Sequence, residues 1–124
     1  MASRDTLTKR QQTFADLLFK AGVSQKLARS LAALASGEEL TSRELEVIGK
    51  LRQPEVSIVM KEMRRRHWVK MRAVRGEGKG RPCYAYRLAV PVQEIVSIFE
   101  REERSRQREV DDAIARLKSL AKKF

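Results

Sequence analysis

Hydrophobic residues recur every three or four positions through the first half of the chain, which predicts four amphipathic helices. These helices lie within residues 8–22, 24–37 and 41–49 and from Pro54 onward. Two of them begin with capping-box spacing, Thr8 with Gln11 and Thr41 with Glu44, in which side chains satisfy otherwise free N–H groups. Pro54 suits a first helical turn because it has no N–H to leave unpaired.

Each predicted helix carries an apolar stripe that we expect to face the core. The expected inward residues are Phe14, Leu17, Leu18 and Ala21, then Leu27, Ala28, Leu31, Leu34 and Ala35, then Leu45 and Ile48, then Val56, Val59, Met60 and Met63. Burying the last four residues leaves a largely polar face on the other side of the fourth helix. That opposite face carries Pro54, Ser57, Ile58, Lys61 and Arg65.

The hydrophobic period changes to two at Trp68, where "WVKMRAV" and later "CYAYRL" alternate. The segment "RGEGKGRP" separates these runs, so they predict a β-hairpin whose loop is longer and more charged than a minimal turn. Tyr84, Tyr86 and Leu88 share one face of the second strand and are expected to cover the core. Trp68 is expected to anchor the join between helix and strand.

Residues 92–124 predict one long helix after Pro91. A heptad pattern places Val96, Glu103, Val110, Leu117 and Phe124 at one seam position and Phe99, Arg106, Ala113 and Leu120 at the other. The seam is apolar at both ends and charged in the middle, and so small a domain offers no obvious partner for it. We therefore expect a homodimer, with a helix packed back on its own domain as the alternative. The expected dimerisation residues are Val96, Phe99, Val110, Ala113, Leu117, Leu120 and Phe124.

Two short helices joined by a tight turn that contains glycine form a helix-turn-helix. The hairpin that follows them turns this arrangement into a winged helix. The expected fold is mainly α with a small β-hairpin (α+β), a winged helix-turn-helix with a long C-terminal dimerisation helix. We expect a winged-helix DNA-binding domain in residues 1–91 and the dimerisation helix in residues 92–124.

Composition excludes several classes of function. The 124-residue chain has one cysteine and one histidine, too few for a Cys/His metal cluster. No stretch approaches the ~18 uncharged apolar residues of a membrane span, and the N-terminal residues lack the apolar core of a signal peptide. The sequence contains no recognisable catalytic set or phosphate-binding loop. We expect a cytoplasmic, non-enzymatic protein without metal or cofactor.

The net charge of +11 favours an anionic partner. Residues 61–81 alone hold nine basic and two acidic side chains, so the cationic surface centres on the fourth helix and the hairpin. A helix fits the major groove of double-stranded DNA, where Gln53, Ser57 and Lys61 can reach base edges or phosphates. Ile58 suits contact with a thymine methyl group. The alternative interpretation is a solvated basic helix face with one exposed isoleucine.

The glycines of the hairpin loop let its backbone approach a duplex, while Lys79 and Arg81 reach phosphates or the minor groove. Taken alone, the loop fits a plain charged hairpin turn equally well, and the neighbouring helix-turn-helix favours the DNA interpretation. The predicted DNA-binding residues are Thr41, Ser42, Arg43, Arg52, Gln53, Pro54, Ser57, Ile58, Lys61, Arg65, Arg75, Lys79, Gly80 and Arg81.

Residues 41–89, "TSRELEVIGKLRQPEVSIVMKEMRRRHWVKMRAVRGEGKGRPCYAYRLA", resemble the winged-helix transcription regulators of the TrmB and MarR type. By that resemblance, "RQPEVSIVMKEM" is the recognition helix, "GEGKGRP" is the tip of the wing, and the long terminal helix is the dimerisation element. The resemblance implies a homodimeric transcription regulator that binds double-stranded DNA sequence-specifically and represses by covering a promoter element. We expect no added effector domain, and the resemblance names no small-molecule effector.

Two other functions remain open. A nonspecific, chromatin-like protein would coat DNA with the same surface and little base readout, and winged helices also serve as protein-interaction modules. The basic loop argues against an interaction module. Gln53, Ser57 and Ile58 on the groove-facing side favour a sequence-specific regulator over a DNA-coating protein.

Overall fold

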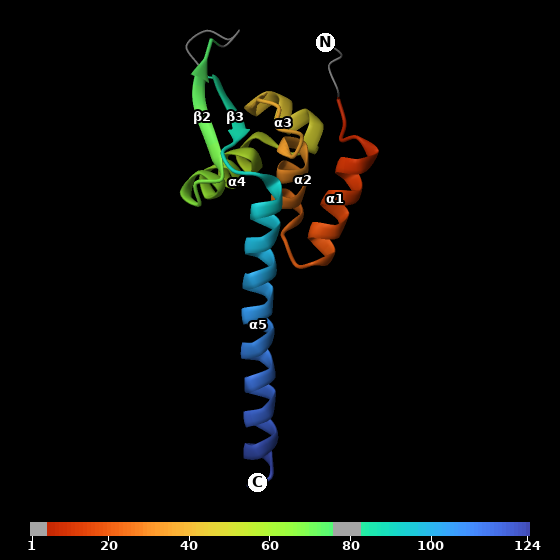
Figure 1. Cartoon of the computed structure of the whole chain (residues 1–124), viewed down its shortest axis with the longest axis vertical. Helices are drawn as coiled ribbons and strands as arrows, with labels where there is room; N and C mark the ends of the chain where they lie inside the picture. Colours follow the sequence, from red (N-terminus) through yellow and green to blue (C-terminus); the bar gives the residue numbers. More distant parts are fainter. Residues whose placement is uncertain (1–4, 76–82) are drawn as a thin grey trace. The chain divides into compact units, whose positions relative to one another are not determined.

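The computed structural model of the chain describes residues 5–75 and 83–124. The chain divides into two compact units, Met1–Val92 and Gln93–Phe124. In chain order the described elements are α1 (Lys9–Lys20), α2 (Gln25–Leu34), β1 (Leu40–Thr41), α3 (Ser42–Gly49), α4 (Gln53–Arg65), β2 (Val69–Val74), β3 (Cys83–Leu88) and α5 (Val92–Ala121). The second unit therefore consists almost entirely of α5 (Figure 1).

The first unit is a winged helix-turn-helix, which confirms the predicted fold class. Its strands form one antiparallel sheet in the order β1-β3-β2 beside the helices (Figure 1). β3 pairs along its whole length with β2, so that Val69 lies opposite Leu88 and Val74 lies opposite Cys83. The other edge of β3 pairs with β1, which the sequence did not predict because two residues show no alternation.

The core of this unit is built from the apolar stripes of α2, α3 and α4. Its most deeply buried large side chains include Leu31, Leu34, Leu45, Val56, Met60 and Met63, all of them predicted to face inward. Trp68 is also buried, and the guanidinium carbon of Arg66 lies 4.6 Å from the centre of its ring. The predicted anchor between α4 and β2 is therefore confirmed.

The prediction for the inward face of α1 was wrong in part. Thr8 and Gln11 form the expected capping box, but the buried residues of the helix are Gln11, Ala15 and Leu18. Ala15 is small enough to let another helix approach closely. The side-chain oxygen of Gln11 accepts the Thr8 N–H, so this amide can be buried. With this side of α1 turned inward, Leu17 is 60% exposed, and Ala21, Phe14 and Phe19 are not part of the core.

Leu45 and Val47 on α3 differ in burial, so we expect them to contribute differently to the free energy of unfolding. Leu45 is fully buried, whereas Val47 on the same helix is 48% exposed. Leu45→Ala should lower the free energy of unfolding by about 2–5 kcal/mol, because it removes buried methyl groups and leaves a cavity. Val47→Ala is the matched control and should change it by less than about 0.5 kcal/mol. Urea denaturation checks both, and equal losses for the two variants would contradict this packing.

Candidate nucleic-acid interface

The start of α3 is held by side chains that were predicted to contact DNA. The Thr41 hydroxyl accepts the Glu44 N–H at 3.1 Å, and the Thr41 N–H donates to the Glu44 carboxylate at 2.8 Å. The Ser42 hydroxyl donates to the Tyr84 carbonyl at 3.4 Å, which ties α3 to β3. Thr41 and Ser42 are half-buried, so these hydroxyls first of all position the helix.

A tight turn of three residues separates α3 from α4. Lys50 takes the left-handed conformation here, with φ 53°, and the Leu51 N–H donates to the Glu46 carbonyl at 2.9 Å. Gly49 is buried at the end of α3, and a Cβ atom there would come within 3.2 Å of the Leu51 side chain. Arg29 of α2 donates through Nε to the Gly49 carbonyl at 2.6 Å, so the turn is fixed to the rest of the domain.

The first turn of α4 is fixed in a similar way. The Arg52 N–H donates to Glu55 Oε1 at 2.8 Å, and Lys26 Nζ of α2 lies 3.2 Å from Glu55 Oε2. The hydrogen bond from the Arg52 backbone, followed by the Lys26 contact, lowers the pKa of Glu55. Gln53 and the Arg52 side chain remain exposed beside this turn.

The solvent-facing side of α4 carries the polar residues that the sequence predicted. Val56, Val59, Met60 and Met63 are buried as expected, and the exposed side carries Pro54, Ser57, Ile58, Lys61 and Arg65. We refer to these five residues as the outer face of α4. Ile58 is 70% exposed in the middle of this face, between polar and charged neighbours. An exposed isoleucine in such surroundings is a candidate contact for an apolar group of a partner.

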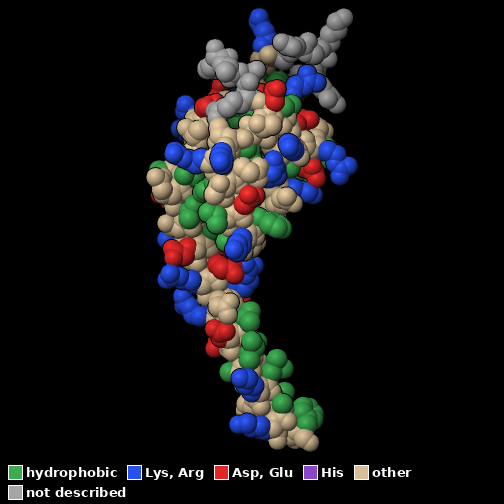
Figure 2. All heavy atoms as spheres, turned by 90° about the vertical axis from the view of Figure 1, so that its right-hand side faces the viewer, with side chains coloured by type: hydrophobic (Ala, Val, Ile, Leu, Met, Phe, Trp, Pro, Cys, Tyr) green, Lys and Arg blue, Asp and Glu red, His purple; other side chains and the backbone are tan. Residues whose placement is uncertain are grey.

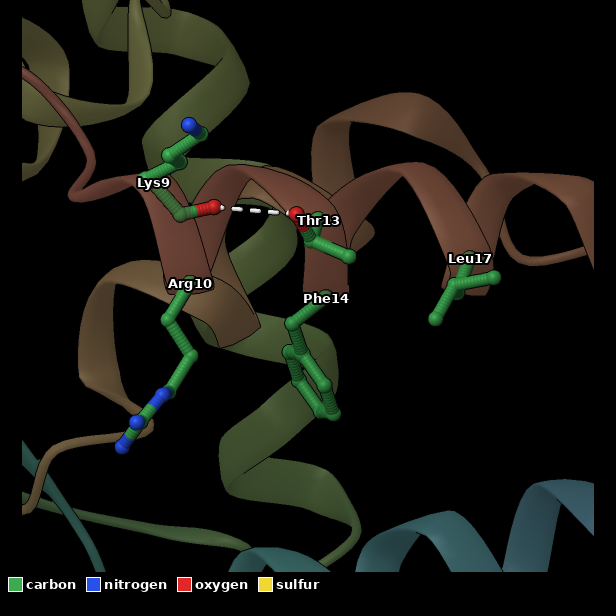
Figure 3. Close-up of a pocket in the computed structure, with 5 residues that line it drawn as sticks. All are labelled: Lys9, Arg10, Thr13, Phe14 and Leu17. Atoms are coloured by element: carbon green, nitrogen blue, oxygen red, sulfur yellow. Dashed lines mark hydrogen bonds between the residues drawn. The ribbon is translucent and has the colours of Figure 1, made fainter.

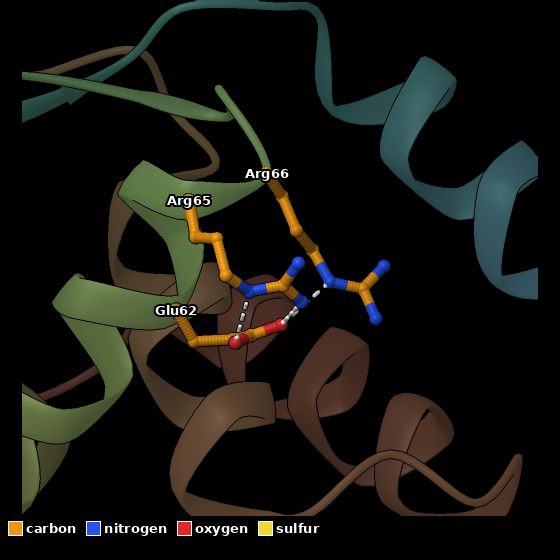
Figure 4. Close-up of polar contacts among 3 residues, drawn as sticks. All are labelled: Glu62, Arg65 and Arg66. Atoms are coloured by element: carbon orange, nitrogen blue, oxygen red, sulfur yellow. Dashed lines mark hydrogen bonds and ion pairs between the residues drawn. The ribbon is translucent and has the colours of Figure 1, made fainter.

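Arg65, at the end of the outer face of α4, is held by a carboxylate (Figure 4). Its Nε and Nη2 donate to the two oxygens of Glu62 at 2.9 and 2.5 Å, and Arg66 Nε donates to the same carboxylate at 2.9 Å. The hydrogen bond from Arg65, followed by that from Arg66, lowers the pKa of Glu62 to about 2. Glu62 was not among the site residues predicted from the sequence, although spacings of three and four residues on a helix favour such pairs.

Other basic side chains of residues 61–81 divide into neutralised and exposed groups. Arg72 on β2 donates through Nε and Nη2 to both oxygens of Glu39, each at 2.6 Å. Lys61, Arg64, Lys70 and Arg75 are exposed and form no ion pair with any residue that the structure describes. These exposed cations thus lie on α4 (Lys61 and Arg64), on β2 (Lys70) and just after β2 (Arg75).

The remaining predicted DNA-binding residues differ in where they lie. Arg43 is exposed on the first turn of α3. Lys79, Gly80 and Arg81 of the wing tip lie outside the described residues.

The predicted dimerisation residues of α5 are mostly exposed, as Figure 2 shows for the apolar side chains near its C-terminal end. Val96, Val110, Leu117, Leu120 and Phe124 are exposed large hydrophobic residues, Ala113 is also exposed, and Phe99 is half-buried. Ile114 is a further exposed apolar residue that the heptad pattern left out. It lies four residues after Val110 and three before Leu117, so it widens the same stripe.

A shallow hollow lies on the surface of α1 (Figure 3). Lys9, Arg10, Thr13, Phe14 and Leu17 line it, and the Thr13 hydroxyl donates to the Lys9 carbonyl at 3.0 Å. All of its walls come from one helix, and it brings no polar groups together from different elements. Such a surface depression lacks the enclosure of a small-molecule site.

Two further features are absent from the described part of the chain. No three acidic, histidine or cysteine side chains there come together in a way that could hold a metal ion. None of the helices there combines the length and apolarity that a membrane crossing requires.

The ion pairs of Glu62 predict its response to pH. Its pKa in the folded protein is lowered from 4.5 to about 2, so any stability from these pairs is present above pH 4.5 and is lost as pH falls toward 2. An NMR titration should place the Glu62 midpoint near 2, and Arg65→Ala should raise it. Arg104→Ala, which removes the partner of Glu100 on α5, is the control and should leave the Glu62 midpoint unchanged. A midpoint near 4.5 in the unaltered protein would rule out the pairing.

Comparison with known proteins identifies the fold. No protein-family model matches the sequence, and no curated protein gives a significant sequence match. Among solved structures, the chain is similar to TrmBL2, an archaeal chromatin protein whose structure shows a novel mode of DNA binding. The TM-score is 0.62 at 19% identity, over 88% of this chain and 39% of that one. The crystal structure of NadR with 4-hydroxyphenylacetate gives a TM-score of 0.49 at 16% identity, over 91% of this chain and 78% of that one. The chain thus spans well under half the length of TrmBL2, and the likeness to TrmBL2 confirms the winged-helix fold.

Proposed function

We propose that the protein is a transcription regulator that binds double-stranded DNA sequence-specifically as a homodimer and acts as a repressor. The observation that carries the proposal is the outer face of α4, where Ile58 is 70% exposed between Ser57 and Lys61. An α-helix fits the major groove, where hydroxyl and ammonium groups reach base edges and an apolar side chain contacts a thymine methyl. Repression is inferred only from the resemblance to TrmB and MarR regulators.

Rigid attachment of α4 supports its role as the recognition helix. Base readout requires side chains that are held in a fixed position relative to the rest of the domain. The contacts of Arg29 with Gly49 and of Lys26 with Glu55 fix both ends of the turn before α4. Arg43 and Arg52 lie at the starts of α3 and α4, where they can contact phosphates and set the orientation of the domain.

Phosphate contacts would also come from the wing side of this surface. Exposed Lys70 and Arg75 lie on and just after β2, and Lys79, Gly80 and Arg81 follow in the sequence, outside the described residues. Contacts of this kind supply affinity that does not depend on sequence and that weakens as salt rises. The high positive charge of this surface makes a protein-interaction module less suitable, since its partner would have to be strongly acidic.

Nonspecific coating of DNA is the second candidate function. The net charge of +11 and the similarity to TrmBL2, an archaeal chromatin protein, favour it. Both functions use the same cationic surface, and they differ in whether Ser57, Ile58 and Lys61 contribute to the choice of sequence.

Substitutions on the outer face of α4 distinguish these two functions. Ile58→Ala should weaken binding to a site enriched from random duplexes by about 1–3 kcal/mol and should weaken binding to unselected DNA much less. Leu17→Ala on α1 is the matched control, since it also shortens an exposed apolar side chain and should alter neither affinity. Anisotropy titrations with both duplexes provide the measurement. Equal weakening on both duplexes would identify nonspecific coating instead.

The exposed apolar stripe of α5 is the basis for the homodimer. Leu117 is 64% exposed, and Val110, Ile114, Leu120 and Phe124 follow the same side of the helix. A contiguous apolar stripe of this kind favours association with a second helix.

Sedimentation equilibrium tests the homodimer. At micromolar concentration Leu117→Glu should shift the protein from dimer to monomer, because it puts a charge into the seam. Lys118→Glu is the control at the exposed position next to Leu117. It changes the charge by more than Leu117→Glu does, because it replaces a positive side chain by a negative one, and it should leave the dimer intact. A monomeric unaltered protein, or equal dissociation of both variants, would contradict dimerisation through α5.

A further inference from the structure

We propose that two copies of α5 pair antiparallel, with the Glu103 of each chain facing the Arg106 of the other. This inference deepens the proposed homodimer and rests on it. The seam of α5 in each chain packs against the same seam of the second copy. Complementary charge in the middle of the seam is the observation that selects the orientation.

The middle of α5 is polar, and its charged side chains form ion pairs within the helix. Glu103 and Arg106 form an ion pair within one helix, and Glu100 pairs with Arg104 at 2.8 Å one turn earlier. Glu103 is half-buried and Arg106 exposed, and both occupy seam positions of the heptad. Any helix pair that uses the whole seam must therefore bring these two charges together with those of the partner.

Symmetry decides which charges meet. In a parallel pair, the two-fold axis runs along the helices, so each residue faces its own copy. Glu103 would then face Glu103, and Arg106 would face Arg106. In an antiparallel pair the axis is perpendicular to the helices, and residue i meets residue j while j meets i. Glu103 can then face Arg106 twice, which replaces two layers of like charge by two layers of opposite charge.

The same register matches the apolar positions. Because the helices run in opposite directions, a step of some residues along one helix corresponds to an equal step back along the other. Glu103 facing Arg106 therefore fixes every other facing pair. Val96 therefore faces Ala113, Phe99 faces Val110, and Leu117 faces Val92. Every seam layer from residue 92 to residue 117 is then either apolar against apolar or acidic against basic.

A second antiparallel register is conceivable, centred near Ala115 instead of between Arg104 and Ser105. It would pair Val110 with Leu120 and Ala113 with Leu117. However, it leaves Val96 outside the overlap and sets Phe124 against Arg106. The charged middle of the seam would then make no complementary contact. The first register therefore fits the seam from residue 92 to residue 117 better, and it leaves Leu120 and Phe124 beyond the overlap.

The orientation sets the spacing of the two junctions between winged-helix unit and α5. Val92, where the winged-helix unit joins α5, lies about 12.5 residues from the centre of the antiparallel pair, or about 19 Å at 1.5 Å per residue. The two junctions are then about 38 Å apart along the pair. A parallel pair would start both helices side by side, about 10 Å apart.

Spin labels on the outer side of α5 test the orientation without disturbing the seam. Two variants are made in a Cys83→Ser background, Arg101→Cys and Ser119→Cys, both at exposed positions. For the proposed register, axial separations at 1.5 Å per residue are about 10 Å for the label at 101 and about 44 Å for the label at 119. Pulsed dipolar spectroscopy of each labelled dimer measures the distance between the two labels, which also includes the lateral spacing of the helices, and it should give a much longer distance at 119 than at 101.

Three other outcomes would each overturn the proposal. Short distances at both positions would identify a parallel pair. A long distance at 101 with a short one at 119 would identify the register centred near Ala115. Loss of dipolar modulation would identify a monomer and refute the homodimer as well, while a DNA titration of the same samples tests DNA binding independently.

Discussion

The four apolar side chains on the inner side of α4 determine which residues this protein can present to a partner. Val56, Val59, Met60 and Met63 are all buried, and on a helix of 3.6 residues per turn this leaves Ser57, Ile58 and Lys61 facing solvent. Rotation of α4 by even one residue would move polar groups into the core at a cost of several kcal/mol. Folding and the proposed recognition therefore depend on the same packing.

The net charge does not show which basic side chains are free to bind an anion, because several of them pair with carboxylates of the same chain. Glu62 engages Arg65 and Arg66, and Glu39 engages Arg72, so three of the basic side chains around α4 and β2 are at least partly neutralised within the chain. Of the exposed cations that remain, Lys61 belongs to the outer face of α4, and Arg75 follows the end of β2. A DNA phosphate would have to compete with Glu62 for Arg65, whereas Lys61 is directly accessible.

Much of the fold could be predicted because its signals are local. Capping boxes at Thr8 and Thr41 mark helix starts within a residue, and the stripe of α4 repeats often enough to fix its orientation. The inward face of α1 was predicted incorrectly, because small Ala15 and capped Gln11 carry no strong hydrophobic signal. Contacts between distant residues, such as Arg72 with Glu39 across 33 positions, depend on the folded arrangement and leave no pattern in the sequence. The outer face of α4 was predicted in full, but the neutralisation of Arg65 by Glu62 was not.

Mapping of amide chemical shifts during a DNA titration tests the central claim most directly. With a short duplex at low salt, the largest shifts should fall on α4 from Gln53 to Lys61 and on the start of α3, while α1 stays unchanged. Such a pattern would locate the duplex on the outer face of α4. Shifts concentrated on α1, or no shifts at micromolar duplex, would contradict the assignment of α4 as the DNA-binding helix.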